Sequence, residues 1–225
     1  MSLSPEIRAG IRSGIPLILP STAIGISFGV LAQPVMGSFA PVVMSLIVCS
    51  GAAQFAALTV LMAGGGAPAA ITAGMLLNAR WLPMGLALGP YFKGGAFRRA
   101  LESWTIVDAS FAIASRGDGT YSREQLIGAT IPQAGSWILG TVLGVLGGSL
   151  ISDPEAFGLD AMFPAFFAYL LFEEIRGGDR SRLAAATLGA LIAFALMPFT
   201  PAGVPVVVAG AAALIGLRQA RTVAR

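Results

Sequence analysis

The chain has 225 residues and a mean hydropathy of +0.80, with 56% hydrophobic and 11% charged residues. A soluble domain carries about 25% charged residues, so this composition predicts an integral membrane protein with no room for a separate soluble domain. The net charge of +3 comes from basic loops and a basic tail, which indicates membrane orientation and not a nucleic-acid partner. The chain has no histidine and one cysteine, Cys49. This excludes histidine-based catalysis, histidine-ligated metals and an internal disulfide, and we expect no metal and no cofactor.

A polytopic helical fold follows from the length of the chain. A membrane-spanning helix needs about 20 apolar residues, so the chain accommodates seven to eight of them with short loops. We expect an all-α membrane protein, with one transmembrane domain over residues 1–225 and the first segment retained as a span and not cleaved as a signal peptide. The hydrophobic segments are 14–32, 40–63, 67–91, 103–114, 126–150, 157–172, 183–199 and 203–217.

The first segment contains residues that bend helices and residues that let helices pack closely. Pro16 and Pro20 predict a kink or a break. Gly25 and Gly29 have the four-residue spacing of small residues at close helix contacts. The fifth segment has a similar pattern, which allows an internal repeat that matches Pro16, Gly25 and Gly29 with Pro132, Gly140 and Gly144.

The distribution of lysine and arginine predicts the orientation of the chain. The N-terminus, the 173–182 loop and the C-terminus are basic, so we place them in the cytoplasm, and the acidic 151–156 loop outside. If all eight segments cross, the basic 92–102 loop faces outside, against the rule. The conflict disappears if two segments are re-entrant: the fourth, which is short, and the second, which is broken at Gly51. Both topologies stay open.

Four polar residues interrupt apolar segments: Gln54, Asn78, Arg80 and Asp108. An arginine at the centre of a bilayer costs about 2.5–3.5 kcal/mol, so such groups are kept where protein or water surrounds them. The pattern predicts a polar site inside the membrane. No motif has the spacing of a catalytic site, so we do not expect an enzyme.

Each of these residues has a functional and a structural interpretation. Arg80 could hold a substrate carboxylate through two hydrogen bonds, or lie at a helix end, or pair with Asp108. Asp108 could neutralise Arg80, bind a substrate ammonium group or carry a coupling proton. Asn78 and Gln54 could bind substrate or make hydrogen bonds between helices. We expect Gly51–Phe55 to form unwound backbone at the site.

These residues resemble the AzlC-type large subunit of branched-chain amino acid permeases. The resemblance runs from Gly14 to about Gly216, and departs from the family at Trp81, where histidine is common, and at Ala109, where glutamate is common. It rests on G-A-A-Q-F at Gly51–Phe55, N-x-R at Asn78–Arg80, Asp108 before Ser110-Phe111-Ala112, and Gly158-Leu159-Asp160.

The resemblance implies an inner-membrane exporter of branched-chain or other apolar amino acids, which works with a small membrane subunit of the AzlD type. Proton coupling and homo-oligomerisation are compatible with it. The alternatives are a passive channel or facilitator for small amphipathic solutes, and a scaffold subunit without transport. The expected substrate-binding residues are Gly51, Gln54, Phe55, Asn78, Arg80 and Asp108.

Overall fold

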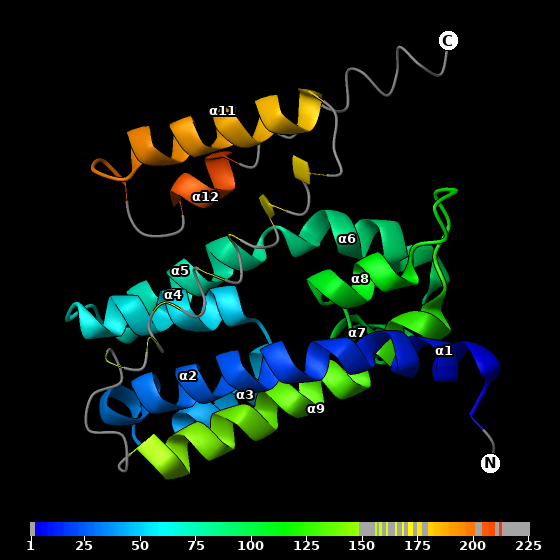
Figure 1. Ribbon diagram of the computed structural model, residues 1–225, viewed down its shortest axis with the longest axis horizontal. Helices are drawn as coiled ribbons and strands as arrows, with labels where there is room; N and C mark the ends of the chain where they lie inside the picture. The colour runs from blue at the N-terminus through cyan, green and yellow to red at the C-terminus, as the bar shows by residue number, and fades with distance from the viewer. Residues whose placement is uncertain are drawn as a thin grey trace. The chain divides into compact units, whose positions relative to one another are not determined.

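The computed structural model describes residues 3–148 and, beyond them, 156, 158, 161, 165, 168, 171–172, 175–176, 180–200, 204–209 and 212. These residues form helices, and their β-structure consists of one isolated bridge between Ser115 and Tyr121 (Figure 1). The helices are α1 (Pro5–Gly14), η1 (Ile15–Leu17), α2 (Ile18–Met36), α3 (Ala40–Val48), α4 (Gly51–Met62), α5 (Ala67–Asn78), α6 (Trp81–Leu88), η2 (Gly89–Tyr91), α7 (Ala96–Ser103), α8 (Asp108–Ala114), α9 (Arg123–Gly147), α11 (Arg180–Leu196) and α12 (Val204–Ala209).

The chain divides into two compact units. Unit 1 comprises Met1–Gln54 and Trp81–Asp160, and unit 2 comprises Phe55–Arg80 and Ala161–Arg225. In unit 2, the short helix α12 packs against α11 and against α5. The prediction of a single domain over residues 1–225 stays a prediction.

Two helical stretches among the described residues are long and apolar enough to cross a membrane. The first runs for 32 residues through α1, η1 and α2, and the second is α9, with 25 residues. The 3₁₀ turn η1 contains Pro16, whose missing N–H removes one helical hydrogen bond, so the predicted irregularity lies here. Pro20 lies in the first turn of α2, where a proline is tolerated.

Glycines allow the first helical stretch and α9 to pack backbone against backbone. A Cβ added at Gly25 would lie 2.5 Å from the carbonyl oxygen of Trp137, and one added at Gly140 would overlap the carbonyl oxygen of Thr22. Such separations are closer than any side chain tolerates, so only glycine fits at this contact.

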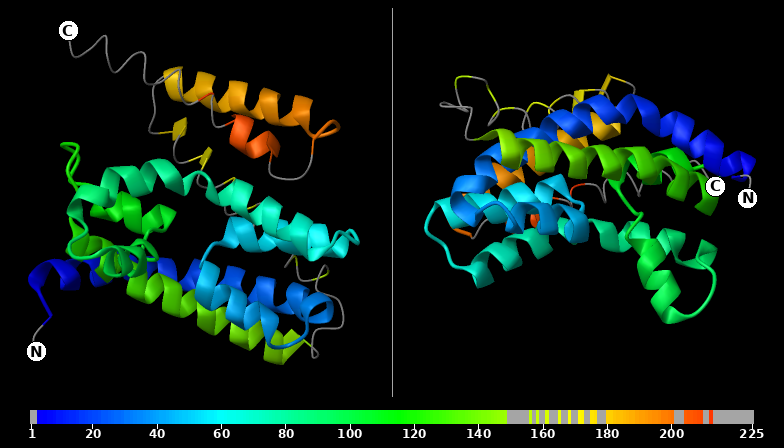
Figure 2. Two further views of the ribbon diagram at one scale, coloured as in Figure 1. Left: turned by 180° about the vertical axis from the view of Figure 1, so that it is seen from behind. Right: turned by 90° about the horizontal axis from the view of Figure 1, so that it is seen from below.

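The two helices of this pair run parallel. Gly10 meets Gln125 near the start of both stretches, and Gly29 meets Thr141 near the end of both. Figure 1 and Figure 2 show α1 and α2 alongside α9, with both stretches beginning at one end of unit 1. The internal repeat stays a prediction.

Three predicted segments contain helix breaks. The second segment divides into α3 and α4, with Cys49 and Ser50 between them. The third divides into α5 and α6 at Ala79 and Arg80, and the fourth is non-helical over residues 104–107, between α7 and α8. The shorter apolar helices Gly51–Met62, Ala67–Asn78 and Leu183–Leu196 have 10–17 residues. The expected count of seven to eight spans is therefore not established, and most of the predicted sixth and eighth segments lie outside the described residues.

Candidate functional site at the helix breaks

The six predicted site residues all lie at or beside helix breaks. Gly51, Gln54 and Phe55 belong to the first turns of α4, and Asp108 is the first residue of α8. Of the remaining two, Asn78 is the last residue of α5, and Arg80 lies in the break between α5 and α6. Helix breaks expose backbone groups at membrane depth, and membrane transporters use such breaks to bind solutes.

The break before α4 is fixed by two residues. Cys49 has the left-handed conformation, with φ of 45° and ψ of 37°, which ends α3. The Ser50 hydroxyl then accepts a hydrogen bond from the Ala53 amide at 3.4 Å, as a capping residue does at the start of a helix. Gly51–Phe55 are helical, so the expectation that they form unwound backbone is wrong. Ser50 was the available signal for this boundary, because serine is favoured immediately before a helix.

Gln54 is completely buried, and the protein satisfies its amide group. The Trp137 indole nitrogen donates to Gln54 Oε1 at 3.0 Å, and Gln54 Nε2 donates to Ser45 Oγ at 2.8 Å. Ser45 Oγ lies 2.8 Å from Thr141 Oγ1, and the Thr141 hydroxyl donates to the carbonyl oxygen of Trp137 at 3.1 Å.

The direction of each hydrogen bond in this ring is determined by chemistry. An indole N–H can only donate, so it must face the oxygen of the Gln54 amide. The single Thr141 hydroxyl hydrogen is used on Trp137, so Thr141 accepts from Ser45. We call these four residues, Ser45, Gln54, Trp137 and Thr141, the polar ring. It joins α3, α4 and α9, and it supports the structural interpretation of Gln54.

The polar ring contains three residues that sequence reasoning missed: Ser45, Trp137 and Thr141. Trp137 lies 83 residues from Gln54, and Thr141 lies 96 residues from Ser45, so no local pattern links them. A signal was nevertheless present on α9, since Trp137 and Thr141 share the helix face of Gly140 and Gly144, which packs inside unit 1.

Arg80 lies at the break between α5 and α6, in unit 2. Its Nη1 donates to the carbonyl oxygen of Leu77 at 3.0 Å. The last carbonyls of a helix have no partner within that helix, so the guanidinium group closes the end of α5. The predicted pairing of Arg80 with Asp108 stays a prediction, because the two residues belong to different units.

Asp108 follows an irregular stretch, residues 104–107, that hydrogen bonds hold in place. The buried Ser110 hydroxyl accepts from the Val107 amide at 3.1 Å and donates to the Thr105 carbonyl oxygen at 2.8 Å. The hydroxyl of Thr130, on α9, donates to the same Thr105 oxygen at 2.7 Å. Asp108 lies near the middle of the predicted fourth segment. In the structure it is the first residue of a helix, α8.

Trp104 connects the stretch before Asp108 with the helix that precedes α4. Its indole nitrogen donates to the carbonyl oxygen of Leu46 at 3.1 Å. Leu46 lies in the last turn of α3, whose carbonyls have lost their helical partners at the break after Val48. Unit 1 therefore joins the segment that carries Gly51 and Gln54 with the segment that carries Asp108.

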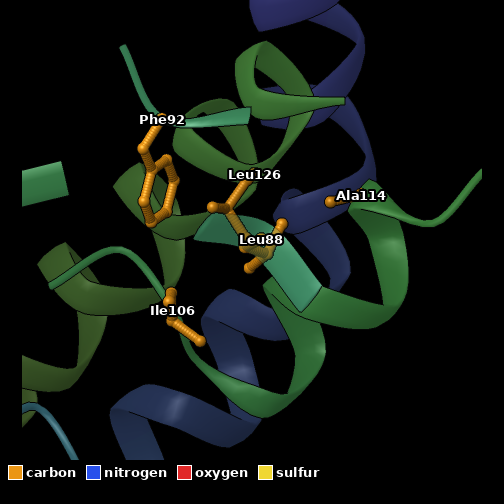
Figure 3. Close-up of a cluster of buried hydrophobic side chains, with 5 residues drawn as sticks. All are labelled: Leu88, Phe92, Ile106, Ala114 and Leu126. Atoms are coloured by element: carbon orange, nitrogen blue, oxygen red, sulfur yellow. The ribbon is translucent and has the colours of Figure 1, made fainter. Parts of the chain in front are cut away.

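A hydrophobic cluster also anchors the segment that carries Asp108. Ile106 and Ala114, which bracket Asp108, pack with residues of α6, α9 and the stretch after η2 (Figure 3). Burial of each large apolar side chain contributes about 1.5–3 kcal/mol. The cluster consists of Leu88, Phe92, Ile106, Ala114 and Leu126, and Met84, Phe111 and Tyr121 pack against it.

Ion pairs gather where α1 and α9 begin. Glu102, at the end of α7, pairs with Arg123 through both carboxylate oxygens and with Arg98 at 3.0 Å. The hydrogen bond from Arg123 lowers the pKa of the Glu102 carboxyl to about 2, and Arg98 acts in the same direction. Glu6 of α1 pairs with Arg116 at 3.0 Å. We call this end of unit 1, which carries Arg8, Arg98, Arg116 and Arg123, the basic end.

Within the described part of the chain, no group of three histidine, cysteine, aspartate or glutamate side chains could hold a metal ion. The groups that the structure does place at the breaks are an amide, a guanidinium, a carboxylate and backbone polar groups. A guanidinium group can bind a carboxylate, and a carboxylate can bind an ammonium group, by hydrogen bonds and charge.

Comparison with known proteins places the chain among membrane proteins. It is 28% identical over 215 residues to an uncharacterized membrane protein of Archaeoglobus fulgidus, covering 91% of each chain. It is 27% identical to the inner membrane protein YgaZ of Escherichia coli, covering 84% of this chain and 81% of YgaZ.

A third relative is the branched-chain amino acid transport protein AzlC of Bacillus subtilis, which is 22% identical over 77% of this chain and 71% of that protein. No solved structure matches the chain. The family described as AzlC protein matches residues 16–151, which is more than half of the chain and includes all six predicted site residues. The chain therefore belongs to the AzlC family.

Proposed function

We propose that the chain is an inner-membrane transporter that exports branched-chain or other apolar amino acids. The observation that carries the proposal is the coincidence of polar side chains with helix breaks, at Gln54, at Arg80 and at Asp108. The family assignment supports a membrane transport role, and the printed name of the Bacillus subtilis relative supports this substrate class.

The solute would be held by complementary charges. Arg80 would bind the carboxylate, because a guanidinium group matches two carboxylate oxygens, and Asn78 would lie beside it. Asp108 would bind the ammonium group or carry the coupling proton. Gly51 and Phe55 would contact the solute from α4, while Gln54 fixes that helix through the polar ring.

Charge distribution supports a cytoplasmic N-terminus. The basic end carries Arg8, Arg98, Arg116 and Arg123, whereas Gly37–Phe39, at the other end of the parallel pair, are uncharged. Cytoplasmic ends of membrane proteins are enriched in lysine and arginine. The export direction and a small partner subunit of the AzlD type rest on the family resemblance, and we include both in the proposal.

Efflux from cells that lack their own exporters tests the proposal. Cells are loaded with dipeptides of valine, leucine, isoleucine and methionine, and amino acid efflux is followed with the chain alone and with a small partner subunit. We expect efflux from the wild type, at least a tenfold loss in Arg80→Gln, and little change in Lys93→Gln, which removes an exposed cation between η2 and α7. Equal efflux from all variants at matched membrane abundance would contradict the role of Arg80.

A further inference from the structure

We infer that residues 104–114 form a re-entrant hairpin, which enters the membrane from the basic end, carries Asp108 at its tip and returns to the same end. The inference requires that the chain crosses the membrane through α1–α2 and through α9, which among the described residues are the two stretches long and apolar enough to do so. It does not require that the solute is an amino acid. All the contacts that carry it lie within unit 1.

The two ends of the hairpin lie at the same end of unit 1. On the entering side, Glu102 accepts from Arg123 Nε at 2.7 Å, and Arg123 is the first residue of α9. On the returning side, the Ser122 amide donates to the Ala114 carbonyl oxygen at 2.9 Å. A segment that crossed the membrane would separate these two sites by about 30 Å.

A second contact secures the returning side to the first helix. Arg116 pairs with Glu6 of α1 at 3.0 Å, and the Ser122 hydroxyl donates to the other oxygen of Glu6 at 2.7 Å. Figure 1 shows α7, α8 and the beginning of α9 at the end of unit 1 where α1 begins. The chain therefore leaves the basic end after α7 and comes back to it after α8.

The tip of the hairpin lies deeper in the membrane than Arg123, the first residue of α9. The Thr105 carbonyl oxygen accepts from Thr130, seven residues after Arg123. At 1.5 Å of rise per residue, seven residues place this contact about 10 Å along α9. Asp108 follows three residues later, before α8 turns back toward Ser122.

Non-helical backbone at this depth is tolerated only where protein or water satisfies its polar groups. The structure meets this requirement, since Ser110 and Thr130 satisfy the Thr105 carbonyl, and Ser110 also satisfies the Val107 amide. Trp104 fastens the hairpin to α3 through the Leu46 carbonyl. Ile106 and Ala114 of the hairpin also pack in the hydrophobic cluster with Leu126 of α9.

The hairpin restricts the route of the rest of the chain. The helix α2 ends at the far end of the parallel pair, and the chain is back at the basic end by α7. Only the second and third predicted segments lie between α2 and α7 in the chain. One of these segments must therefore cross the membrane, and the other must return to the face from which it started. With a cytoplasmic basic end, the hairpin presents Asp108 to solutes that arrive from the cytoplasm.

Labelling of single cysteines with a membrane-impermeant maleimide tests the hairpin. In a Cys49→Ser background, Gly95→Cys and Asp118→Cys mark the two sides of the hairpin, and Ser38→Cys marks the far end. The reagent is added to the outside of intact cells and, separately, to inverted membrane vesicles. We expect Gly95→Cys and Asp118→Cys to react only in inverted vesicles, and Ser38→Cys to react only from outside.

Labelling of Gly95→Cys and Asp118→Cys from opposite faces would overturn the hairpin, because the segment would then cross the membrane. Labelling of both from outside would overturn cytoplasmic access. Asp108→Cys should react in inverted vesicles, at least tenfold more slowly than Asp118→Cys. Reaction of Asp108→Cys only from outside, or only after unfolding in detergent, would also overturn access from the cytoplasm. The labelling determines topology without a transport assay. A failure of the hairpin inference can therefore be distinguished from a failure of the proposed function.

Discussion

The indole of Trp137 has one hydrogen to donate, and it donates it to the buried amide of Gln54. That single contact determines the orientation of the Gln54 amide and, through Ser45 and Thr141, closes the polar ring. This closed set of buried hydrogen bonds gives α3, α4 and α9 one arrangement, because any slip of one helix leaves a buried polar atom without its partner. The polar ring is thus the device that holds the start of α4 in place.

Replacement of Trp137 by phenylalanine should destabilise the protein by about 1–3 kcal/mol, because Gln54 Oε1 is left buried without a donor. Replacement of both residues, Trp137→Phe with Gln54→Leu, should cost less than the sum of the single changes, since neither polar partner remains. Thermal unfolding of the purified protein in detergent measures both effects. Additive losses would show that the two side chains do not act together.

At the scale of the helices, the glycine contact between α2 and α9 determines how the two long stretches pair. Gly25 and Gly140 allow main chain to approach main chain, which gives the parallel arrangement on which the topology depends. Alanine at such a position must push the helices apart. Alanine in place of a glycine that faces open space should instead stabilise the helix, because glycine weakens a helix relative to alanine by about 0.5–1 kcal/mol.

Gly140→Ala should therefore lower the unfolding temperature and reduce membrane abundance, because the new Cβ overlaps the Thr22 carbonyl oxygen. Gly135→Ala is the matched control on the same helix, since nothing lies within 4 Å of its Cβ position. It should leave stability unchanged or raise it slightly. The two variants are compared by size-exclusion chromatography after stepwise heating, and equal behaviour would mean that α2 and α9 do not pack through this contact.

The long helices could be predicted from the sequence, and the helix breaks only in part. The apolar run 126–150 corresponds to α9, Arg123–Gly147, since a long hydrophobic run has few alternatives to a helix in a membrane. The break near Gly51 was expected, but its position at Cys49 and Ser50 depends on a left-handed residue and on one hydroxyl. The polar residues Gln54 and Asp108 identified the interrupted segments. The bonds that Trp137 makes to Gln54, and Thr130 to the Thr105 carbonyl oxygen, join distant parts of the chain and could not be predicted.

At the scale of the whole molecule, transport requires that the chain carries solutes across a membrane. The family assignment supports membrane transport, and the helix breaks carry polar groups that could bind a solute. A carrier alternates the access to its site, so unlabelled solute on one side of a membrane drives the accumulation of labelled solute from the other. A passive channel does not couple the two fluxes, and a scaffold subunit carries no flux.

Counterflow in proteoliposomes therefore tests this requirement most directly. Vesicles that contain the purified chain, with and without a small partner subunit, are loaded with unlabelled leucine and diluted into a trace of radiolabelled leucine. We predict a transient accumulation of label, which is lost in Arg80→Gln and retained in Lys93→Gln. Equilibration of label without accumulation would indicate a channel. The absence of any flux for leucine, isoleucine, valine and methionine, from correctly inserted protein, would contradict the proposed function.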